Sequence, residues 1–304
     1  MSTYVFFLFE LIFIPTSGQL GKVYYITSLK NHTYNSDYNN VTYLQCFVLD
    51  FFLFLKKLIT MEILGIDIGG SGIKGAIVNI TDGTLINERH RIITPQPATP
   101  QAVAETVNAL VKHFNYTGPI GCGFPALIRN GIAKTASNID KSWVDIPVEK
   151  LLSDATGQTV SVINDADAAG LGELRFGAGN GHLGVVMMLT IGTGIGSAII
   201  HQGILLPCTE LGHVEFKGDS AERYCSDAAR ERKKLSWNKW GKRFNKYLLH
   251  MEMLFSPDLF ILGGGASKKF DKFKDQLSVN AVVVPATLRN MAGIIGAACF
   301  VGDK

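Results

Sequence analysis

The sequence predicts an α/β protein with two lobes that follow one plan. Along residues 62–301, short apolar segments typical of buried strands alternate with segments of helical periodicity. The unit of strand, glycine-rich turn and strand at 66–77 returns at 189–199, and both copies contain the spacing Gly-Ile-x-x-Ala-Ile, which begins at Gly72 and at Gly194. This repeat predicts that each lobe directs one glycine-rich turn toward a shared cleft.

Length and composition exclude several classes of protein. A chain of 304 residues can bury a sizeable core without disulfides. Its formal charge of +3 is too small for a protein that binds nucleic acid over its whole surface. The five cysteines are scattered and include no C-x-x-C pair, which argues against a disulfide scaffold and a cysteine zinc site. We therefore expect a reducing location, the cytoplasm.

Residues 1–60 differ in composition from the rest of the chain. They hold 14 of the 30 aromatic residues but only 2 of the 32 glycines, and they lack alanine and arginine. Their apolar runs at 5–15 and 46–59 are shorter than the roughly 20 residues of a membrane span, and no basic signal-peptide segment precedes Tyr4. We expect a start codon assigned too early, with Met61 opening the ordered chain. A poorly ordered tail and a targeting or anchoring element are the alternatives.

The first lobe is expected at residues 61–180. Thr99 and Pro100 have the character of a helix start, and Gly157 is typical of a helix end. Turn residues such as Asp82-Gly83 separate the strands of an initial meander. The predicted strands are 62–68, 73–80, 84–93, 120–124 and 160–163. The predicted helices are 100–114, 148–156 and 166–175.

The second lobe is expected at residues 181–304. After the repeated strand pair, a charged helical stretch is predicted at 221–235, and Ser236 is a plausible cap of the next helix. The apolar stripe of that helix predicts a core made of Trp237, Trp240, Phe244, Tyr247, Leu248, Met251 and Leu254. Strands are predicted at 259–262 and 281–284. The closing helix at 291–301 can pack back on the first lobe.

Three glycine-rich turns each follow a buried strand, at 69–72, 192–196 and 263–265. Successive backbone N–H groups in such a bend form a nest for phosphate oxygens. Hairpin tightness alone does not explain Asp67 and Lys74 beside the first turn. No P-loop or helix-linked G-x-G-x-x-G motif is present. The candidate phosphate-binding residues are Asp67, Gly69, Gly70, Ser71, Gly72, Lys74, Thr193, Gly194, Gly264 and Gly265.

Polar residues that suit a hydroxyl-bearing substrate follow the later strands. Asp165 stands between a buried strand and a helix, where an ionised carboxylate is favoured and could accept a proton from an attacking hydroxyl. Asn164-Asp165 is equally common as a helix cap, so the residues alone leave both interpretations open. Glu210-x-x-His213 offers an acceptor and an imidazole three residues apart, which suits hydrogen bonds to sugar hydroxyls.

With these motifs the chain resembles the ROK sugar kinases of the actin/hexokinase superfamily. The resemblance rests on MEILGIDIGGSGIKGA at 61–76, IGTGIGSA, Asn164-Asp165 and ELGH at 210–213, and it extends over about 61–302. The stretch from Arg223 through LSWNKWGKRFNKYL to PDLFILGGGASKK at 257–269 is similar to the polyphosphate-dependent glucokinases of that family.

The resemblance implies a two-lobed actin-like ATPase (ribonuclease H-like) fold with duplicated βββαβα lobes. It implies phosphorylation of glucose at the 6-hydroxyl with Asp165 as catalytic base, Mg²⁺ as cofactor, and polyphosphate or ATP as donor. It also implies a homodimer without nucleic-acid or membrane partners. Many family members carry a zinc loop after ELGH, which this chain lacks, so no structural zinc is expected. The implied glucose contacts are Asn138, Asn164, Asp165, Glu210 and His213.

A cluster of basic residues bears on the phosphoryl donor. A polyphosphate chain would be held by such a track, whereas the competing interpretation is a solvated helix face. The basic residues are Arg230, Arg232, Lys233, Lys234, Lys239, Lys242, Arg243 and Lys246, with Lys268, Lys269 and Lys272 as a second group. Two alternatives remain: a strictly ATP-dependent hexose kinase and a sugar-sensing regulator. The regulator predicts a basic helix-turn-helix before the lobes, but residues 1–60 contain no Arg and only four Lys.

Overall fold

The computed structural model describes residues 5–13, 21–29, 62–136 and 139–303. The chain divides into two compact units, Met1–Lys57 and Leu58–Lys304. In the first unit, β1 (Val5–Phe13) and β2 (Gly21–Leu29) pair antiparallel. Within the described ranges, no helix combines the length and the apolar character needed to cross a membrane.

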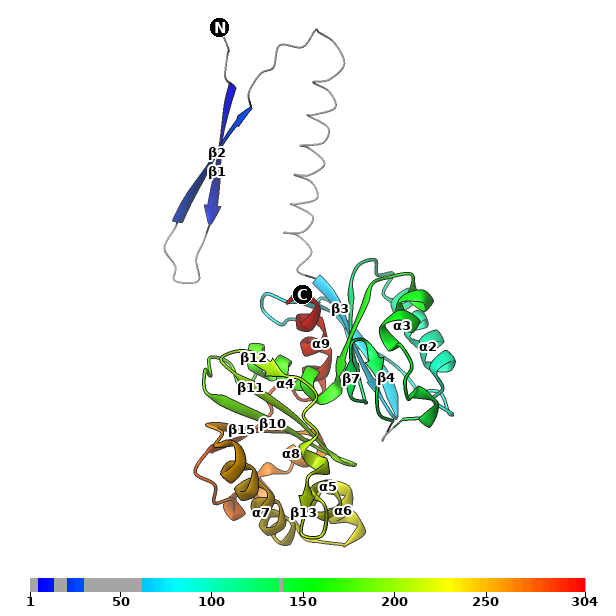
Figure 1. Ribbon diagram of the computed structural model, residues 1–304, viewed down its shortest axis with the longest axis vertical. Helices are drawn as coiled ribbons and strands as arrows, with labels where there is room; N and C mark the ends of the chain where they lie inside the picture. The colour runs from blue at the N-terminus through cyan, green and yellow to red at the C-terminus, as the bar shows by residue number, and fades with distance from the viewer. Residues whose placement is uncertain (1–4, 14–20, 30–61, 137–138, 304) are drawn as a thin grey trace. The chain divides into compact units, whose positions relative to one another are not determined.

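The second unit contains two five-stranded sheets with the same strand order (Figure 1). The N-terminal sheet has the order β5-β4-β3-β6-β9, in which β5, β4 and β3 are antiparallel neighbours and β6 and β9 continue parallel to β3. The C-terminal sheet has the order β12-β11-β10-β15-β16 with the same directions. The chain therefore forms a duplicated α/β fold, as the repeat of strand, glycine-rich turn and strand predicts.

Each of the two sheets is built from three antiparallel strands followed by two parallel ones. The N-terminal sheet comprises β3 (Glu62–Gly69), β4 (Gly72–Asn79), β5 (His90–Ile92), β6 (Ile120–Phe124) and β9 (Val160–Asn164). The C-terminal sheet comprises β10 (Val185–Ile191), β11 (Ile195–His201), β12 (Ile204–Leu206), β15 (Leu259–Gly263) and β16 (Val282–Pro285). The short pairs are β7 (Ile128–Arg129) with β8 (Ile132–Ala133), and β13 (Glu215–Phe216) with β14 (Asp219–Ser220). The α-helices are α2 (Pro100–His113), α3 (Val148–Thr156), α4 (Asp165–Phe176), α5 (Ala221–Cys225), α6 (Asp227–Arg232), α7 (Trp237–Phe255), α8 (Gly264–Ser267) and α9 (Ala292–Gly302).

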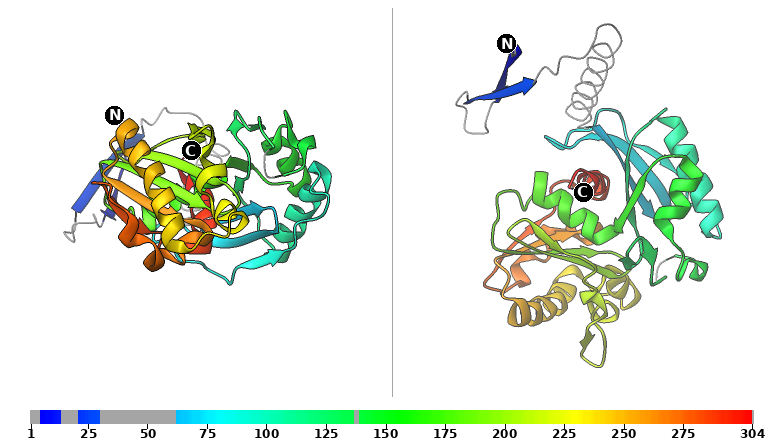
Figure 2. Two further views of the ribbon diagram at one scale, coloured as in Figure 1. Left: turned by 90° about the horizontal axis from the view of Figure 1, so that it is seen from below. Right: turned by 45° about the horizontal axis from the view of Figure 1, so that its top comes forward.

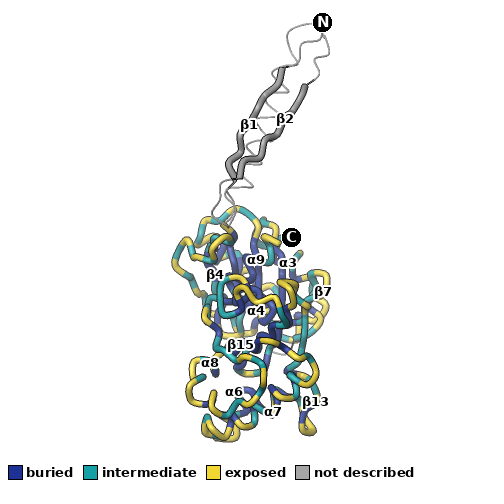
Figure 3. Tube along the Cα trace, turned by 90° about the vertical axis from the view of Figure 1, so that its left-hand side faces the viewer, coloured by how far each residue is buried: buried dark blue, intermediate teal, exposed yellow. Residues whose placement is uncertain are grey.

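The outer face of each sheet is covered by helices that connect strands of that same sheet. Helices α2 and α3 bury a core against the N-terminal sheet that includes Ile66, Leu110 and Trp143. Helix α7 buries Trp240 and Phe244 against the C-terminal sheet. Buried residues concentrate in the interior of the unit (Figure 3). Each lobe therefore has its own apolar core, which supports the shape of the cleft between them.

The inner faces are covered by a reciprocal exchange of helices. Helix α4 follows the N-terminal sheet but packs on the C-terminal one, where Ala169 and Leu174 meet Val186 and Met188. Helix α9 follows the C-terminal sheet but packs on β3 and β4 through Ile294 and its neighbours. Figure 2 shows α9, in red, between the two sheets. Each sheet thus depends on a helix from the other half of the chain.

Helices α4 and α9 also contact each other at unusually short range. A methyl group at Gly296 would overlap the carbonyl oxygen of Ala168, and one at Gly172 would overlap that of Ala292. Only glycine permits this backbone approach, because any Cβ would force the helices apart. The contact fixes how closely the two lobes approach on the side where α4 and α9 cross.

Three sequence-based predictions differ from the structure. The third strand, predicted at 84–93, is reduced to β5, because the Asn87 side chain accepts the Ile77 N–H at 3.0 Å in place of a backbone partner. The helix predicted at 221–235 is two helices, α5 and α6, because Ser226 caps a new start by accepting the N–H of Ala229 at 3.1 Å. Leu254, predicted in the core, is 52% exposed near the end of α7.

Candidate active site

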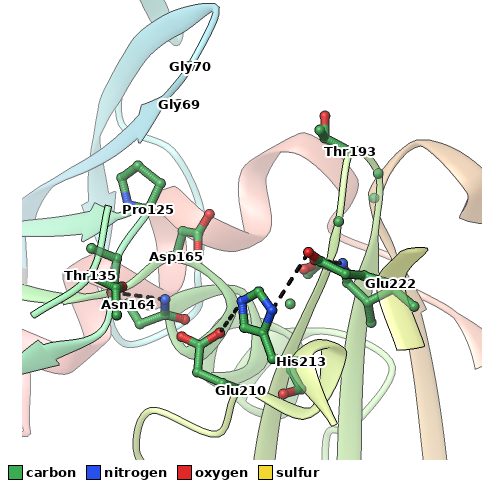
Figure 4. A pocket seen from close by; sticks show the side chains of 18 of the residues that line it. Gly69, Gly70, Pro125, Thr135, Asn164, Asp165, Thr193, Glu210, His213 and Glu222 are labelled. Carbon is green, nitrogen blue, oxygen red and sulfur yellow. Dashed lines mark hydrogen bonds and ion pairs between the residues drawn. The ribbon is translucent and has the colours of Figure 1, made fainter. Parts of the chain in front are cut away.

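A cavity of about 520 Å³ lies between the lobes and takes residues from both sheets (Figure 4). Its size is within the range of small-molecule sites. The N-terminal half contributes Gly69, Gly70, Ser71, Pro125, Ala126, Thr135, Asn164 and Asp165. The C-terminal half contributes Thr190, Gly192, Thr193, Gly194, Ile195, Gly196, Ser197, Thr209, Glu210, His213, Glu222 and Gly264. The cavity therefore joins residues from all three glycine-rich turns to the candidate catalytic and sugar-binding side chains.

Asp165 is the first residue of α4, and its carboxylate is open to the cavity. Protein nevertheless surrounds the carboxylate closely enough to remove much of its hydration. This desolvation, together with repulsion from Asp67 and Glu210, raises the pKa of Asp165 to about 7. A carboxylate poised near neutral pH is suited to accept a proton during a reaction.

Asn164 resolves the ambiguity about the Asn-Asp pair. Its side-chain oxygen accepts the N–H groups of Ala166 and Asp167 at 2.9 and 3.1 Å, so Asn164 is the helix cap. Its amide nitrogen donates to the Ala126 carbonyl at 3.1 Å. The other N–H of the Asn164 amide has no partner within the described residues, and the neighbouring Asp165 has its Oδ1 engaged as acceptor of the Ala166 N–H at 2.9 Å. Capping of α4 therefore rests mainly on Asn164, which leaves Asp165 as the candidate catalytic carboxylate.

The C-terminal half brings an imidazole between two carboxylates. His213 Nε2 lies 3.7 Å from Glu210 Oε2, and His213 Nδ1 lies 3.7 Å from Glu222 Oε1 (Figure 4). Burial raises the pKa of Glu210, while His213 opposes that shift. Such a row of acceptors and an imidazole can bind several neighbouring hydroxyl groups at once.

Glu222 is a site residue that the sequence reasoning missed. Its second carboxylate oxygen accepts the Ile195 N–H at 3.3 Å, so Glu222 connects the second glycine-rich turn to His213. The sequence offers only a faint signal, an acidic residue in the first turn of a short helix soon after ELGH. Its position becomes evident only when α5 is placed beside the β10–β11 turn.

Five candidate residues are not among those that line the cavity. Lys74 Nζ is bound to Asp67 Oδ2 at 3.0 Å, with both side chains less than a quarter exposed. Gly72 and Gly265 also lie outside the cavity lining. Asn138 lies outside the described residues. The first turn thus meets the cavity through Gly69 to Ser71, with the Asp67–Lys74 ion pair behind it.

Asp167 is fully buried in the first turn of α4, two residues after Asp165. Its Oδ2 accepts the N–H of Cys208 at 2.7 Å, while its Oδ1 has no hydrogen-bond partner. Desolvation raises the pKa of Asp167 to about 7. The bond fixes residue 208 two positions before Glu210, so a buried carboxylate of α4 supports the segment that carries the candidate sugar-binding motif.

Helix α6 connects the basic cluster to the cavity. The Ala228 N–H donates to the Gly192 carbonyl at 3.1 Å, and a Cβ at Gly265 would lie 3.9 Å from the Asp227 carboxylate. Arg230 is bound to Asp227 at 2.6 Å and lies over the Trp237 ring. The exposed cations begin at the end of this helix: Arg232, Lys233, Lys234, Lys239, Lys242 and Lys246. The cluster therefore starts beside the second and third glycine-rich turns.

Comparison with known proteins agrees with this site. A match to the ROK family spans residues 63–229. The chain belongs to the ROK family. A curated polyphosphate glucokinase of Mycobacterium tuberculosis (strain CDC 1551 / Oshkosh) is 48% identical over 235 residues, which cover 77% of this chain and 89% of the relative.

Two solved structures give the same picture of the fold. An inorganic polyphosphate/ATP-glucomannokinase from Arthrobacter sp. strain KM has a TM-score of 0.76 and 48% identity, and the match covers 79% of this chain and 98% of that one. A ROK family glucokinase from Streptomyces griseus, in complex with glucose and AMPPNP, has a TM-score of 0.69 and 24% identity, over 80% and 100% of the two chains. These ROK kinases have the actin-like ATPase fold, and this chain shares it.

Proposed function

We propose that this ROK family enzyme phosphorylates glucose at its 6-hydroxyl with inorganic polyphosphate as donor. The carrying observation is the cavity, in which the Asp165 carboxylate faces the Glu210–His213–Glu222 row while three glycine-rich turns contribute backbone to the same space. The names of the relatives at 48% identity support this assignment of substrate and donor.

Each group has a separate role in the proposed reaction. The glucose hydroxyls are held by Glu210, His213 and Glu222, and by the free amide N–H of Asn164. Asp165 orients the 6-hydroxyl and takes its proton as the oxygen attacks the terminal phosphoryl group. Backbone N–H groups of the glycine-rich turns stabilise the charge that develops on the phosphoryl oxygens. Asn138 is proposed as a further sugar contact.

Asp67 is the residue best suited to hold a magnesium ion. No group of three or more His, Cys, Asp and Glu in the described part of the chain could form a metal cage. Mg²⁺ usually binds through one or two carboxylates together with substrate phosphates, and Asp67 supplies one carboxylate beside the first glycine-rich turn. When bound, the ion neutralises negative charge on the donor phosphates.

The position of the basic cluster favours polyphosphate over ATP as the donor. The cations follow α6, whose backbone bonds to the second glycine-rich turn, so a linear polyanion could leave the cavity directly onto them. Additive contacts to successive phosphates would hold it without any nucleoside pocket. The second candidate is a strictly ATP-dependent hexose kinase, because ATP is the other donor in the name of the polyphosphate/ATP-glucomannokinase relative.

A donor comparison tests the proposal. Glucose phosphorylation is measured with polyphosphate and with ATP at equal concentrations of transferable phosphoryl groups. We expect a higher kcat/KM with polyphosphate, and a loss of that preference as salt is raised, because salt screens the contacts to the chain. Turnover with ATP alone would replace the proposal with the second candidate. Glucose binding without turnover from either donor would indicate a sugar-sensing regulator.

We propose lobes at 61–180 and 181–304 within a homodimer, with residues 1–60 outside the catalytic unit. Light scattering of the full chain and of a chain that starts at Met61 tests both points. We expect a mass of twice the chain and equal kcat for the two proteins. A monomer, or a large loss of kcat on removal of residues 1–60, would contradict this organisation.

A further inference from the structure

Three side chains of one segment bond to three successive carbonyl groups of the first glycine-rich turn. Arg91 Nη2 donates to the Ser71 carbonyl at 2.6 Å. Thr94 Oγ1 donates to the Gly69 carbonyl at 2.5 Å, and Gln96 Nε2 donates to the Gly70 carbonyl at 3.5 Å. We call Arg91, Thr94 and Gln96 the turn clamp. The segment runs from β5 toward α2 and contacts this turn from outside the cavity lining.

The clamp determines where the N–H groups of the turn point. In a trans peptide the C=O of one residue and the N–H of the next point in opposite directions. The only cis peptide bond in the described residues is Gln96–Pro97, so the peptides of the turn are trans. With its carbonyl oxygen held by the clamp, each of these peptides directs its N–H away from the clamp. The N–H groups of Gly70 and Ser71 are oriented in this way, whereas that of Gly72 faces Gly69, its antiparallel partner across the turn.

The side opposite the clamp borders the cavity, because Gly69, Gly70 and Ser71 line it. Successive N–H groups on one side of a bend form an anion-binding nest. Their carbonyl groups would otherwise be free to rotate toward the donor and repel its negative oxygens. A turn held from outside therefore presents donors to a phosphate without reorganisation, which is the property that stabilises developing charge most effectively.

Burial and packing indicate that the clamp is built into the lobe. Thr94 is only 2% exposed, so its hydroxyl has few alternatives to the Gly69 carbonyl. A Cβ at Gly72 would collide with the Arg91 guanidinium, so glycine at this position is what allows Arg91 to lie across the turn. In the register of the sheet, Arg91 on β5 lies opposite Lys74 on β4, and Lys74 lies opposite Asp67 on β3.

The second glycine-rich turn is held differently. Its Gly192 carbonyl accepts a backbone N–H from α6, and its Ile195 N–H donates to Glu222. The strand equivalent to β5 is β12, and its side chains, from Ile204 to Leu206, carry no hydrogen-bond donor that could hold that turn. The clamp is thus a property of the N-terminal lobe rather than of the repeated fold.

We propose that Arg91, Thr94 and Gln96 are positioning residues for the phosphoryl donor, which hold the carbonyl groups of the turn and so orient the N–H groups of Gly70 and Ser71 toward its terminal phosphate oxygens. The inference rests on the proposed function, since it assumes that the donor occupies this end of the cavity. It adds three residues that do not touch the reacting atoms but set the geometry of the backbone that does.

The test compares Thr94→Val, which removes the hydroxyl, with Thr94→Ser, which keeps it. Thr106→Val is the matched control, because Thr106 makes a similar 2.8 Å bond to the Ala102 carbonyl within α2, away from the cavity. We expect Thr94→Val to raise the KM for polyphosphate about five- to tenfold, the worth of one well-placed hydrogen bond. The KM for glucose should stay unchanged, and Thr94→Ser and Thr106→Val should resemble the parent protein.

Tripolyphosphate binding, measured by calorimetry without glucose, separates this inference from the proposed function. A similar weakening in Thr94→Val supports the clamp even if the parent protein does not phosphorylate glucose. Unchanged tripolyphosphate affinity and unchanged KM for polyphosphate in Thr94→Val would overturn the inference. An equal rise in both KM values would also overturn it, because that pattern indicates general damage to the lobe.

Arg91→Met provides a second route if Thr94→Val does not fold. Loss of a positioning bond should weaken tripolyphosphate binding by the same factor at low and high salt. A direct contact between the Arg91 charge and the phosphate should instead weaken binding strongly at low salt and little at high salt. The second pattern would overturn the positioning role of Arg91.

Discussion

The two lobes have the same strand order but contribute different chemistry to the cleft. In the N-terminal lobe, Asp67 precedes the glycine-rich turn, whereas Thr190 takes the equivalent place in the C-terminal lobe. The helix after the first sheet begins with Asp165 at the cavity, while the helix after the second sheet begins with Ala292-Gly293 beside Asp67, where a Cβ at Gly293 would lie 3.5 Å from its carboxyl carbon. The proposed acid-base group and the candidate magnesium ligand thus belong to one half, and the proposed sugar-binding row belongs to the other.

In this molecule a repeated fold therefore does not carry a repeated set of functional side chains. Duplication supplies two glycine-rich turns at one cleft, and side chains at equivalent positions then diverge. If the division is correct, loss of the Asp165 carboxylate should affect mainly turnover, and changes in the C-terminal half should affect mainly substrate affinity.

The largest effect is expected from Asp165→Asn. The amide keeps the shape of the side chain but cannot accept the hydroxyl proton, so kcat should fall by at least about 10²-fold. The Kd for glucose, measured by calorimetry, should change little. Asp154→Asn, an exposed change on α3 distant from the cavity lining, is a control for the handling of the protein. Near-parental turnover in Asp165→Asn would remove this residue from the role of base.

A pH profile tests the same carboxylate without a mutation. The pKa of Asp165 is raised to about 7, and the base must be ionised, so protonation below that value removes activity. The kcat/KM for glucose should therefore fall about tenfold for each pH unit below 7 and be level above it, since each unit changes the ionised fraction tenfold. A flat profile down to pH 5 would show that this carboxylate ionises like an ordinary aspartate.

Glu222→Gln should affect the sugar rather than the donor. The exchange removes a charged acceptor 3.7 Å from His213, and hydrogen bonds to charged groups are worth about 1.5–3 kcal/mol. The KM for glucose should rise about tenfold or more, while the KM for polyphosphate changes little. Glu215→Gln, an exposed carboxylate on β13, is the matched control. A larger rise in the KM for polyphosphate than in the KM for glucose would show that Glu222 contacts the phosphoryl donor and not the sugar.

The smallest effect is expected from the basic cluster. Replacement of Lys233 and Lys234 by Gln removes two exposed cations just beyond α6. At low salt the KM for polyphosphate should rise severalfold, roughly 1 kcal/mol in total, and the effect should vanish at high salt. Any activity with ATP should be unaffected. An equal effect on both donors would mean that the cluster stabilises the lobe instead of holding a chain.

The sequence predicted the regular parts of the fold well. The strand at 120–124 and the helix at 148–156 have the bounds that were predicted, because a continuous apolar run and the left-handed Gly157 are local signals. The third strand was overextended because the Asn87 side chain replaces a ladder bond, which no local pattern indicates. Local periodicity cannot show that the Ile77 N–H bonds to a side chain ten residues away and not to the backbone of a neighbouring strand.

The candidate site was predicted only where its residues form short motifs. Asp165, Glu210 and His213 lie in the cavity, and each belongs to a recognisable pair or spacing. Glu222 was missed because its relation to His213 depends on the placement of α5. Thr94 was missed for the same reason, since its partner, Gly69, is 25 residues away. Residues that act through distant backbone carry no signature of their own.

The exchange of α4 and α9 between the sheets determines what would happen if the chain were cut between its two halves. A break near residue 180 would leave two fragments, each carrying the helix that covers the other's sheet. Neither fragment could bury its inner sheet face alone, so separate expression should give insoluble or unstructured pieces. Mixed together, they hold all the surfaces needed to rebuild the cleft. The molecule is in this sense a natural candidate for fragment complementation, in which activity would report the meeting of its two halves.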